Sequence, residues 1–342
     1  MGYASEKKEV ERNKKRLKWI GVVLIGVCIV FACVLRAFLS SETWIYYLNT
    51  PKTGKRGEGE LRIHFIDVGQ GDATLIELPD GKLALIDGGN GTSASNTALL
   101  RHLNALDADT VDYLFLTHAD EDHYGGLTAV LEHKNVLRAF LPETPKTPTA
   151  SYERFYAKLL QEGCPYFTAC PPNAEHPEMK LSVSEGAYPY ALTVVYPYIQ
   201  NAEDGDTAKT DDNASSVVIW LDYMGTSALF TGDAPKSVEE RLMRDGALGL
   251  HARYGVELTS TEILKVAHHG SNDSTGAAFL EFLHLQTAVV SCGEDNDYGH
   301  PSEEALINLR NAGAEIFRTD EDGSVIVTAT KEGAYTVKAL GK

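Results

Sequence analysis

The stretch Thr117–Leu127 reads THADEDHYGGL and places two histidines and two aspartates within six consecutive positions. In an extended segment that leaves a strand, alternate side chains point the same way, so His118, Asp120 and Asp122 can face one point. Imidazole and carboxylate together suit Zn²⁺, Mn²⁺ or Fe²⁺. Helix capping would explain one of the acids, but it does not explain two histidines beside them. The stretch therefore predicts a metal site, with His123 as a fourth candidate ligand.

The same residue types follow two later strands of the expected fold. Asp233 comes shortly after the apolar run ALFT, and His268 and His269 follow the run ILKVA. Alone, an Asp after Gly is usually a turn residue, and a pair of histidines is usually a buried or capping group. The clusters together strengthen the prediction of a metal site, because loops at the ends of strands on a rigid scaffold often carry catalytic and binding residues. In the quoted stretch, Gly125 and Gly126 permit the turn that brings the second histidine back.

Short apolar runs with strand character alternate with helical patterns from Leu61 onward. The runs Leu61–Val68, Ala73–Leu78 and Leu83–Ile86 are separated by the turn sequences GQGD and PDG. Ser95–Leu106 has the apolar spacing of a helix. Because strands with helices between them recur in two halves of the chain, we expect an α/β fold of two packed sheets with helices outside.

The N-terminal region differs from the rest of the chain. Trp19–Leu35 contains no charged residue, and the apolar run continues past Arg36 to Leu39, long enough to cross a bilayer as a helix. Seven basic residues precede this run, and positive charge favours the cytoplasmic side. A cleaved signal peptide and a buried core helix are the alternatives, but no small-residue cleavage site follows the run.

We therefore expect four parts along the chain. They are a basic cytoplasmic N-terminus (1–18), one transmembrane helix (19–39), a flexible linker (40–60) and an extracytoplasmic domain (61–342). The chain has 48 acidic and 31 basic residues, a net charge of −17, and eight of the basic residues lie within residues 1–41. The remainder is thus strongly acidic, which disfavours non-specific binding of polyanions unless metal ions intervene.

The cysteines give little information about function. An external location would let Cys164 and Cys170 form a disulfide, and two separate thiols fit the sequence equally well. Cys292 follows an apolar run and is expected to be buried.

From Leu61 to the C-terminus the chain resembles the metallo-β-lactamase superfamily, in its ComEC-type branch of competence-protein hydrolase domains. The motifs that carry the resemblance are FIDVGQGDATLI, LIDGG, THADEDHYGGL, DDNASSVVIWLDY, LFTGDA, LKVAHHGS and YGHPSEEAL. It implies a four-layer αβ/βα sandwich with the metal site at its edge, preceded here by the transmembrane helix.

The resemblance also implies a ligand set for two divalent ions. His118 and Asp120 would hold the first ion, Asp122, His123 and His268 the second, and Asp233 would bridge them. Two departures concern the first ion: Asp120 stands where the superfamily usually has His, and DDNASSVV contains no counterpart of another usual His. Oxygen ligands favour harder ions, so Mn²⁺ becomes as plausible as Zn²⁺ and we expect the first site to be the weaker.

Further roles follow from the resemblance. Asp122 would orient the attacking water, and His269 would face the substrate or support a ligand. His300 would bind phosphate or donate a proton, unless it is an ordinary loop residue. Asp67 and Asp87 would hold ligands from behind, unless they are simple turn acids. The residues expected to face the substrate are Asn213, Ser215, Ser271 and His300.

The function expected from these features is metal-assisted hydrolysis outside the cytoplasm, with DNA or an oligonucleotide as the substrate of a phosphodiesterase or nuclease. One alternative is hydrolysis of a small or cell-surface phosphoester, as in phosphorylcholine esterases, which resemble this branch. Aromatic residues between 152 and 190 could then stack on a quaternary amine, although packing in the core is the more usual role. A third possibility is a non-catalytic binding module. No protein partner can be predicted.

Overall fold

The computed structural model describes residues 2–38, 44–145, 147–183, 186–197, 213–248 and 253–342. The chain divides into two compact units, Met1–Asn49 and Thr50–Lys342. Residues 1 and 39–43, which belong to the expected N-terminus, transmembrane segment and linker, lie outside the described residues.

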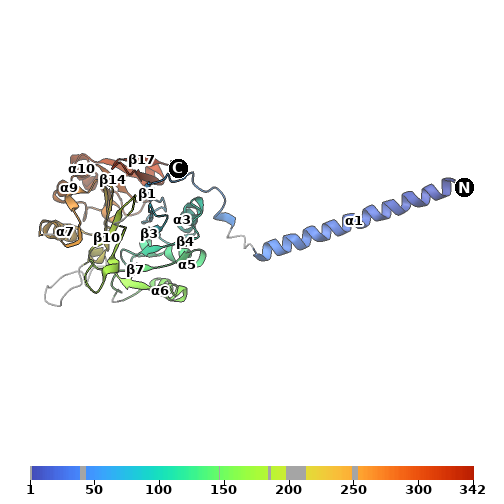
Figure 1. Cartoon of the computed structure of the whole chain (residues 1–342), viewed down its shortest axis with the longest axis horizontal. Coiled ribbons are helices and arrows are strands. Elements are labelled where there is room, and N and C mark those ends of the chain that lie inside the picture. The colour runs from blue at the N-terminus through green and yellow to red at the C-terminus, as the bar shows by residue number, and fades with distance from the viewer. Residues whose placement is uncertain (1, 39–43, 146, 184–185, 198–212, 249–252) are drawn as a thin grey trace. The chain divides into compact units, whose positions relative to one another are not determined.

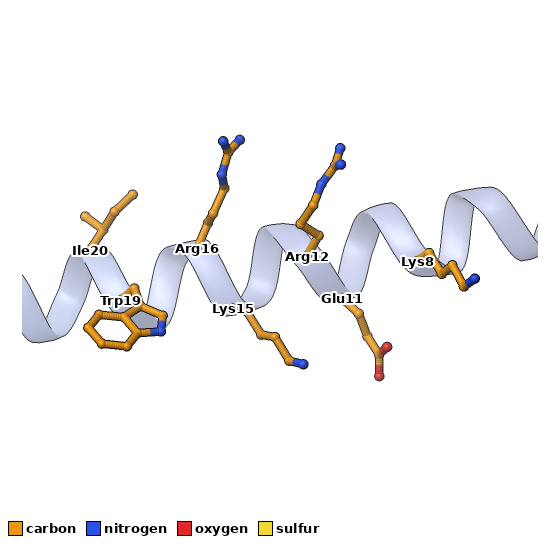
Figure 2. Close-up of a pocket in the computed structure, with 7 residues that line it drawn as sticks. All are labelled: Lys8, Glu11, Arg12, Lys15, Arg16, Trp19 and Ile20. Atoms are coloured by element: carbon orange, nitrogen blue, oxygen red, sulfur yellow. The ribbon is translucent and has the colours of Figure 1, made fainter.

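The first unit contains one long helix, α1 (Gly2–Phe38), in its described part. Its segment Glu11–Arg36 is long and apolar enough to span a membrane, and none of its most apolar stretch is buried. The helix thus begins well before the expected span at Trp19. Figure 2 shows the side chains that project from it around this point: Lys8, Glu11, Arg12, Lys15, Arg16, Trp19 and Ile20.

The second unit is built on two sheets. In spatial order, the first contains β17 (Tyr335–Ala339), β16 (Val325–Ala329), β1 (Leu61–Phe65), β2 (Thr74–Glu77), β3 (Leu83–Ile86), β5 (Tyr113–Phe115), β7 (Ala139–Leu141) and β8 (Tyr166–Thr168). The second contains β15 (Glu315–Arg318), β14 (Thr287–Val290), β13 (Ile263–Lys265), β12 (Thr226–Phe230), β11 (Val218–Tyr223), β10 (Tyr190–Tyr196) and β9 (Lys180–Val183). A separate short ladder joins β4 (Thr110–Val111) to β6 (Asn135–Val136).

Helices lie outside these sheets. They are α3 (Ser93–Ala105), α4 (Glu121–Tyr124), α5 (Leu127–His133), α6 (Ala150–Glu162), α7 (Lys236–Leu248), α9 (Ala277–Leu283), α10 (Glu303–Asn311) and α11 (Thr319–Asp322). In Figure 1, α7 and α9 lie on one flank of this unit and α3 and α5 on the other, with strands between them. Several begin at a capping side chain, as where the Thr92 hydroxyl accepts the N–H of Ser95. The expected four-layer αβ/βα arrangement is confirmed.

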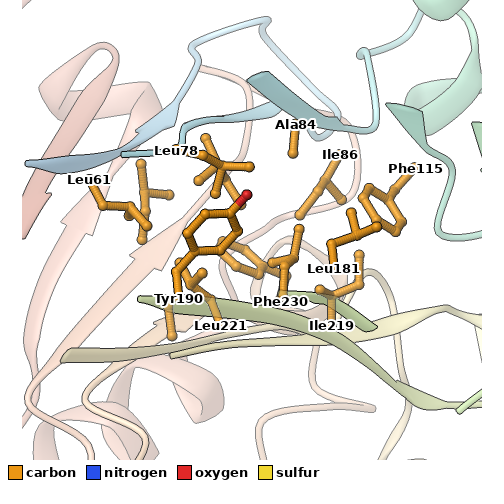
Figure 3. Packing of buried hydrophobic residues seen from close by; sticks show 14 of the residues in the cluster. Leu61, Leu78, Ala84, Ile86, Phe115, Leu181, Tyr190, Ile219, Leu221 and Phe230 are labelled. Carbon is orange, nitrogen blue, oxygen red and sulfur yellow. The ribbon is translucent and has the colours of Figure 1, made fainter. Parts of the chain in front are cut away.

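The core lies between the two sheets, where each strand turns its apolar side chains inward. Figure 3 shows residues of both sheets facing one another, including Leu61, Leu78, Ala84, Ile86, Phe115, Leu181, Tyr190, Ile219, Leu221 and Phe230. The rings of Phe115 and Phe140 stack 4.6 Å apart, and both are buried. Truncating such a buried Phe to Ala costs about 3–5 kcal/mol, so this layer stabilises the strand that precedes the quoted motif.

A second apolar cluster covers the outer face of the second sheet. Trp220 of β11 and Leu264 of β13 pack there against Leu242, Leu283 and Leu309 from three helices. Since both faces of this sheet are covered, its strands are apolar almost throughout, as in other α/β folds.

The outer face of the first sheet carries a buried polar chain of four residues, here called the histidine chain: Arg62, His64, Glu77 and His102. The Nδ1 atom of His64 lies 2.8 Å from Nε2 of His102. The Nε2 atom of His64 lies 2.8 Å from Oε1 of Glu77. Arg62 Nε lies 2.6 Å from the same carboxylate oxygen. Burial lowers the pKa of His64, although Glu77 opposes this, and burial holds the pKa of His102 well below its usual value.

The interval 50–60 differs from the expected flexible linker. Arg62 Nη1 donates to the carbonyl oxygens of Thr53 and Gly54, both at 3.2 Å, and the Tyr223 hydroxyl donates to the Gly59 carbonyl. Arg56 Nη1 also donates to the Glu60 carbonyl oxygen at 3.0 Å. The composition is polar and glycine-rich, but the bonds from Arg62 and Tyr223 attach the interval to β1 and β11.

Both sheets direct the ends of their parallel strands to the same region. β3, β5 and β7 run parallel in the first sheet, and β12, β13 and β14 run parallel in the second. The loops that follow β3, β5, β12, β13 and β14 carry most of the candidate residues, which explains how segments far apart in the sequence meet.

Candidate functional site

The motif after β5 brings two buried histidines beside two partly exposed aspartates. The His118 and His123 side chains are fully buried, whereas those of Asp120 and Asp122 are 45% and 29% exposed. His118 Nε2 lies 3.6 Å from Asp120 Oδ2. The turn needs Gly126, because a Cβ there would stand 2.0 Å from the carbonyl oxygen of Gly88.

Asp233 lies at the centre of the cluster. Its Oδ1 is 3.2 Å from His123 Nε2, and its Oδ2 is 3.8 Å from His118 Nε2 and 3.5 Å from His269 Nε2. Its backbone N–H donates to Ser216 Oγ at 3.1 Å. The preceding Gly232 has φ +52°, a conformation suited to glycine. Asp233 thus contacts candidate ligands of both ions, and its bridging role stays a prediction.

The two histidines after β13 lie in different places. They sit on the turn η5 (Ala267–Gly270) and both have positive φ, 48° and 52°. His269 is buried, and its Nε2 lies 3.2 Å from Asp122 Oδ2. His268 is more exposed, with Nδ1 2.9 Å from Asp273 Oδ1 and Nε2 3.7 Å from Asp233 Oδ2. The geometry therefore groups His269 with Asp122 and His123, a place that the resemblance assigns to His268.

The three buried histidines of this cluster are oriented as metal ligands are. Each buried histidine bonds outward through Nδ1: His118 to Thr117 Oγ1 at 3.1 Å, His123 to Asp87 Oδ2 at 2.8 Å and His269 to the Ser291 carbonyl at 2.9 Å. Among the described residues, none completes a hydrogen bond with the Nε2 atoms of these histidines. Such an arrangement is typical of metal-binding histidines, in which a partner on one nitrogen orients the other toward the cation.

Charges around these histidines shift their protonation strongly. Burial alone would lower the pKa of His269, but Asp233, Asp72 and Asp122 outweigh it and raise the pKa to about 10. Burial is likewise outweighed at His123, where Asp233 and Asp87 raise the pKa well above its usual value. Carboxylates that stabilise a proton at Nε2 stabilise a cation there too, and metal binding would release these protons.

Two residues that we did not predict lie beneath the site. Asp72 and Lys265 form a buried ion pair with side chains 4% and 3% exposed. Asp72 Oδ1 lies 3.4 Å from His269 Nδ1, and its backbone N–H donates to the Asp122 carbonyl at 3.1 Å. Burial would raise the pKa of Asp72, but Lys265 and His269 outweigh it and lower the pKa. Asp72 lies in the turn sequence GQGD. Lys265 is a lone charge in an apolar run, and that pattern could have indicated a buried ion pair.

The two acids expected to support ligands have different roles. Asp87 accepts from the backbone N–H of Thr117 at 2.8 Å and from its hydroxyl at 2.7 Å, besides holding His123. Asp67 accepts from the N–H of Gly69 at 3.2 Å, a contact within its own turn.

The residues expected to face the substrate come from three loops. Asn213 and Ser215 lie on the turn η3 (Asn213–Ser215), next to the Ser216 that binds Asp233. Ser271 Oγ accepts from the backbone N–H of Asp273 at 3.4 Å. Asp273 is the residue whose carboxylate contacts His268. The ring of His300 lies 5.4 Å from that of His268, beside the candidate ligands.

The aromatic residues between 152 and 190 mostly pack in the interior. Tyr152, Phe155 and Tyr190 are buried, and the Tyr156 hydroxyl donates to that of Tyr166 at 3.1 Å. In this region Cys164 and Cys170 are free thiols, and Cys292 is buried as expected.

The chain is similar in sequence to known proteins. The chain is 29% identical over 289 residues to ComE operon protein 3 of Bacillus subtilis, covering 78% of this chain and 33% of that protein. It is 28% identical over 308 residues to competence protein ComA of Neisseria gonorrhoeae, covering 89% of this chain and 38% of that protein. The chain thus spans well under half the length of these curated relatives. The resemblance to the ComEC-type branch is confirmed.

A solved structure and a family model add to these matches. The metallo-beta-lactamase fold protein YhfI from Bacillus subtilis aligns with a TM-score of 0.45 at 11% identity, over 76% of this chain and 96% of that one. The family model of the metallo-beta-lactamase superfamily matches residues 66–294, from the end of β1 to the loop after β14. This chain belongs to the metallo-beta-lactamase superfamily.

Proposed function

We propose that the protein is a membrane-anchored, extracytoplasmic, metal-dependent phosphodiesterase that acts on DNA or oligonucleotides. The observation that carries the proposal is the convergence of three buried Nε2 atoms, from His118, His123 and His269, on the carboxylate of Asp233. Similarity to proteins named for competence supports a nucleic-acid substrate.

The residues present would hold two divalent ions, Zn²⁺ or Mn²⁺. His118 and Asp120 would bind the first, Asp122, His123 and His269 the second, and Asp233 would bridge them. Such ions, when bound, polarise a phosphoryl oxygen and acidify a water molecule toward neutral pH. The first set has a single imidazole and an exposed carboxylate, so we expect it to bind more weakly and to accept Mn²⁺.

The chain's own residues would position the reactants. Asp122 is the least buried acid of the second set, so it would orient the attacking water from the solvent side. Burial lowers the pKa of His300, and His269 and His268 lower it further. His300 would therefore be neutral at pH 7 and would bind a phosphoryl oxygen through an N–H group. Asp87 would keep the His123 ring in place through its Nδ1.

Membrane anchoring through α1 is part of the proposal. No part of the apolar stretch of Glu11–Arg36 is buried in this structure, and basic residues precede it. Positive charge remains in the cytoplasm, which would place residues 50–342 outside. Protease added to intact cells should therefore degrade this part, and its protection until the cells are lysed would contradict the proposed topology.

The test is metal-dependent turnover by the full chain in mild detergent. Substrates are a bis-aryl phosphodiester, a single-stranded oligonucleotide, duplex DNA and phosphorylcholine, each with Mn²⁺ or Zn²⁺. We expect hydrolysis of the first two and a loss of about 100-fold or more in Asp122→Asn, since removing one group that stabilises the reacting charge costs this much. Glu121→Gln is the matched control, because that neighbouring acid is exposed and outside the ligand set.

Two outcomes would overturn the proposal. One is a protein, never exposed to chelator, that contains no metal and takes up none. The other is turnover of phosphorylcholine with no turnover of any phosphodiester, which would select the small-phosphoester alternative.

A further inference from the structure

The loop between β14 and α10 carries an exposed aromatic ring beside the candidate site. Tyr298 is 71% exposed, and its ring lies 5.8 Å from that of His300 at an interplanar angle of 22°. The His300 ring in turn lies 5.4 Å from His268 and 6.2 Å from His269. The ring of His300 therefore lies between those of the two histidines near the candidate metal centre and the exposed phenol ring of Tyr298.

Side-chain bonds from Asn296 hold this loop in shape. Its Oδ1 accepts from the backbone N–H groups of Tyr298 at 3.2 Å and His300 at 3.0 Å. Its Nδ2 donates to the carbonyl oxygens of Gly293 at 2.9 Å and His300 at 2.6 Å. Because the backbone is already fixed, a ligand that stacks on Tyr298 would have little of the loop to order.

We propose that Tyr298 binds one unpaired nucleobase of the nucleotide whose phosphate lies at the candidate metal centre. The inference rests on the proposed phosphodiesterase function and names its substrate class more closely. Single exposed aromatic residues are common on protein surfaces. Tyr298 differs because its ring stacks on that of His300, which itself lies beside the candidate ligands.

Stacking of a base is favoured over binding of a cation on this ring. A stacked base contributes about 5- to 150-fold in affinity, whereas a cation on an exposed aromatic face contributes about 2- to 5-fold. Strong binding of a quaternary amine requires several rings around it. In the part of the chain that the structure describes, the ring contact recorded for Tyr298 is the one with His300.

Acidic neighbours limit how much of a strand can bind. Glu294, Asp295 and Asp297 are exposed on the same loop, where Glu294 forms an ion pair with Lys342 at 2.9 Å. These carboxylates repel further backbone phosphates, since affinity for a nucleic-acid strand normally comes from basic residues. We therefore expect recognition of one base, with little gain in affinity as the oligonucleotide lengthens.

The test is calorimetric binding to the full chain in detergent with Mn²⁺. The ligands are thymidine 5′-monophosphate, deoxyribose 5-phosphate and phosphorylcholine. In the unmodified protein we expect the thymidine compound to bind about 5- to 150-fold more tightly than the sugar phosphate. Tyr298→Ala should bring this ratio close to one, and Tyr298→Phe should preserve it. Tyr166→Ala, at a tyrosine 43% exposed on β8, is the matched control and should preserve it too.

Three results would overturn the inference: a ratio of one in the unmodified protein, a ratio that survives in Tyr298→Ala, or tighter binding of phosphorylcholine that Tyr298→Ala abolishes. Affinity that rises steeply from a dinucleotide to a 12-mer would contradict the limit to one base. These failures leave hydrolysis of a base-free phosphodiester intact. If the protein hydrolyses no phosphodiester of any kind, the proposed function itself fails.

Discussion

Replacing Lys265 by Met tests whether the buried ion pair beneath the site stabilises the fold. The substitution removes the charge and keeps the length of the side chain, so Asp72 would remain as a carboxylate without its main partner. Both side chains are almost fully buried, at 3% and 4% exposure. Breaking a buried pair by removing one partner costs about 3–5 kcal/mol.

The structure places the expected loss at the lower end of that range. His269 Nδ1 still lies 3.4 Å from Asp72 Oδ1, so one positively polarised neighbour remains. We therefore expect a loss of about 3 kcal/mol in the free energy of unfolding. At about 2–4 °C per kcal/mol for a domain of 150–250 residues, the melting temperature should fall by roughly 6–12 °C. We expect a fall in melting temperature near the lower value, because the unit Thr50–Lys342 is longer than the domains to which this range applies.

The assay is thermal unfolding of the full chain with chelator present, so that bound metal does not contribute to stability. Trp220, buried in the second apolar cluster, gives a fluorescence signal for the unfolding of this unit. Lys82→Met is the matched control. Its partner Asp80 is 2.7 Å away, but the two side chains are 42% and 26% exposed, so we expect less than about 1 kcal/mol.

The double variant Lys265→Met with Asp72→Leu provides the second control. It removes both charges, and replacing a buried pair by apolar side chains is often neutral, so much of the lost stability should return. The reasoning would be refuted if Lys265→Met melted together with Lys82→Met. It would also be refuted if the double variant melted below the single one.

Further predictions concern metal binding and pH. Asp87→Asn should weaken metal affinity about 10- to 100-fold, because Asp87 orients His123, whereas Asp67→Asn should leave it unchanged; competition with a chromogenic chelator measures both. His269→Ala should lose more bound metal per chain than His268→Ala by elemental analysis, and the reverse order would favour His268 as the ligand. Burial raises the pKa of Glu239 to about 7, so the stability that its neutral form contributes is present below pH 4.5 and should be lost as pH rises toward 7. Glu239→Gln should flatten the melting temperature between pH 4.5 and 7, and an unchanged slope there would contradict the assignment.

Much of the fold and of the ligand cluster could be predicted from the sequence, for a simple geometric reason. The candidate ligands directly follow apolar strands, and the ends of parallel strands in both sheets meet at one edge. The spacing of the motif therefore predicts that His118 and His123 lie together, and the resemblance adds Asp233 as their neighbour. The core role of most aromatic residues between 152 and 190 also follows from composition.

What could not be predicted depends on local backbone and on pairs from distant segments. Which of His268 and His269 faces the second ion depends on two successive residues with positive φ, a conformation that no spacing rule reveals. The Asp72–Lys265 pair joins a turn in one sheet to a strand in the other. The interval 50–60 has a linker's composition, and long-range bonds from Arg62 and Tyr223 show that it is attached.

The histidine chain of the first sheet makes the stability of this protein sensitive to acid. His64 and His102 have lowered pKa values in the folded state, so the stability they contribute is complete above pH 6.5 and is lost as the solution becomes more acidic. Protonation would place positive charge beside Arg62 at side chains that are buried. Acid should therefore loosen the two segments that the histidine chain holds: α3, which carries His102, and the interval 50–60, to which Arg62 donates.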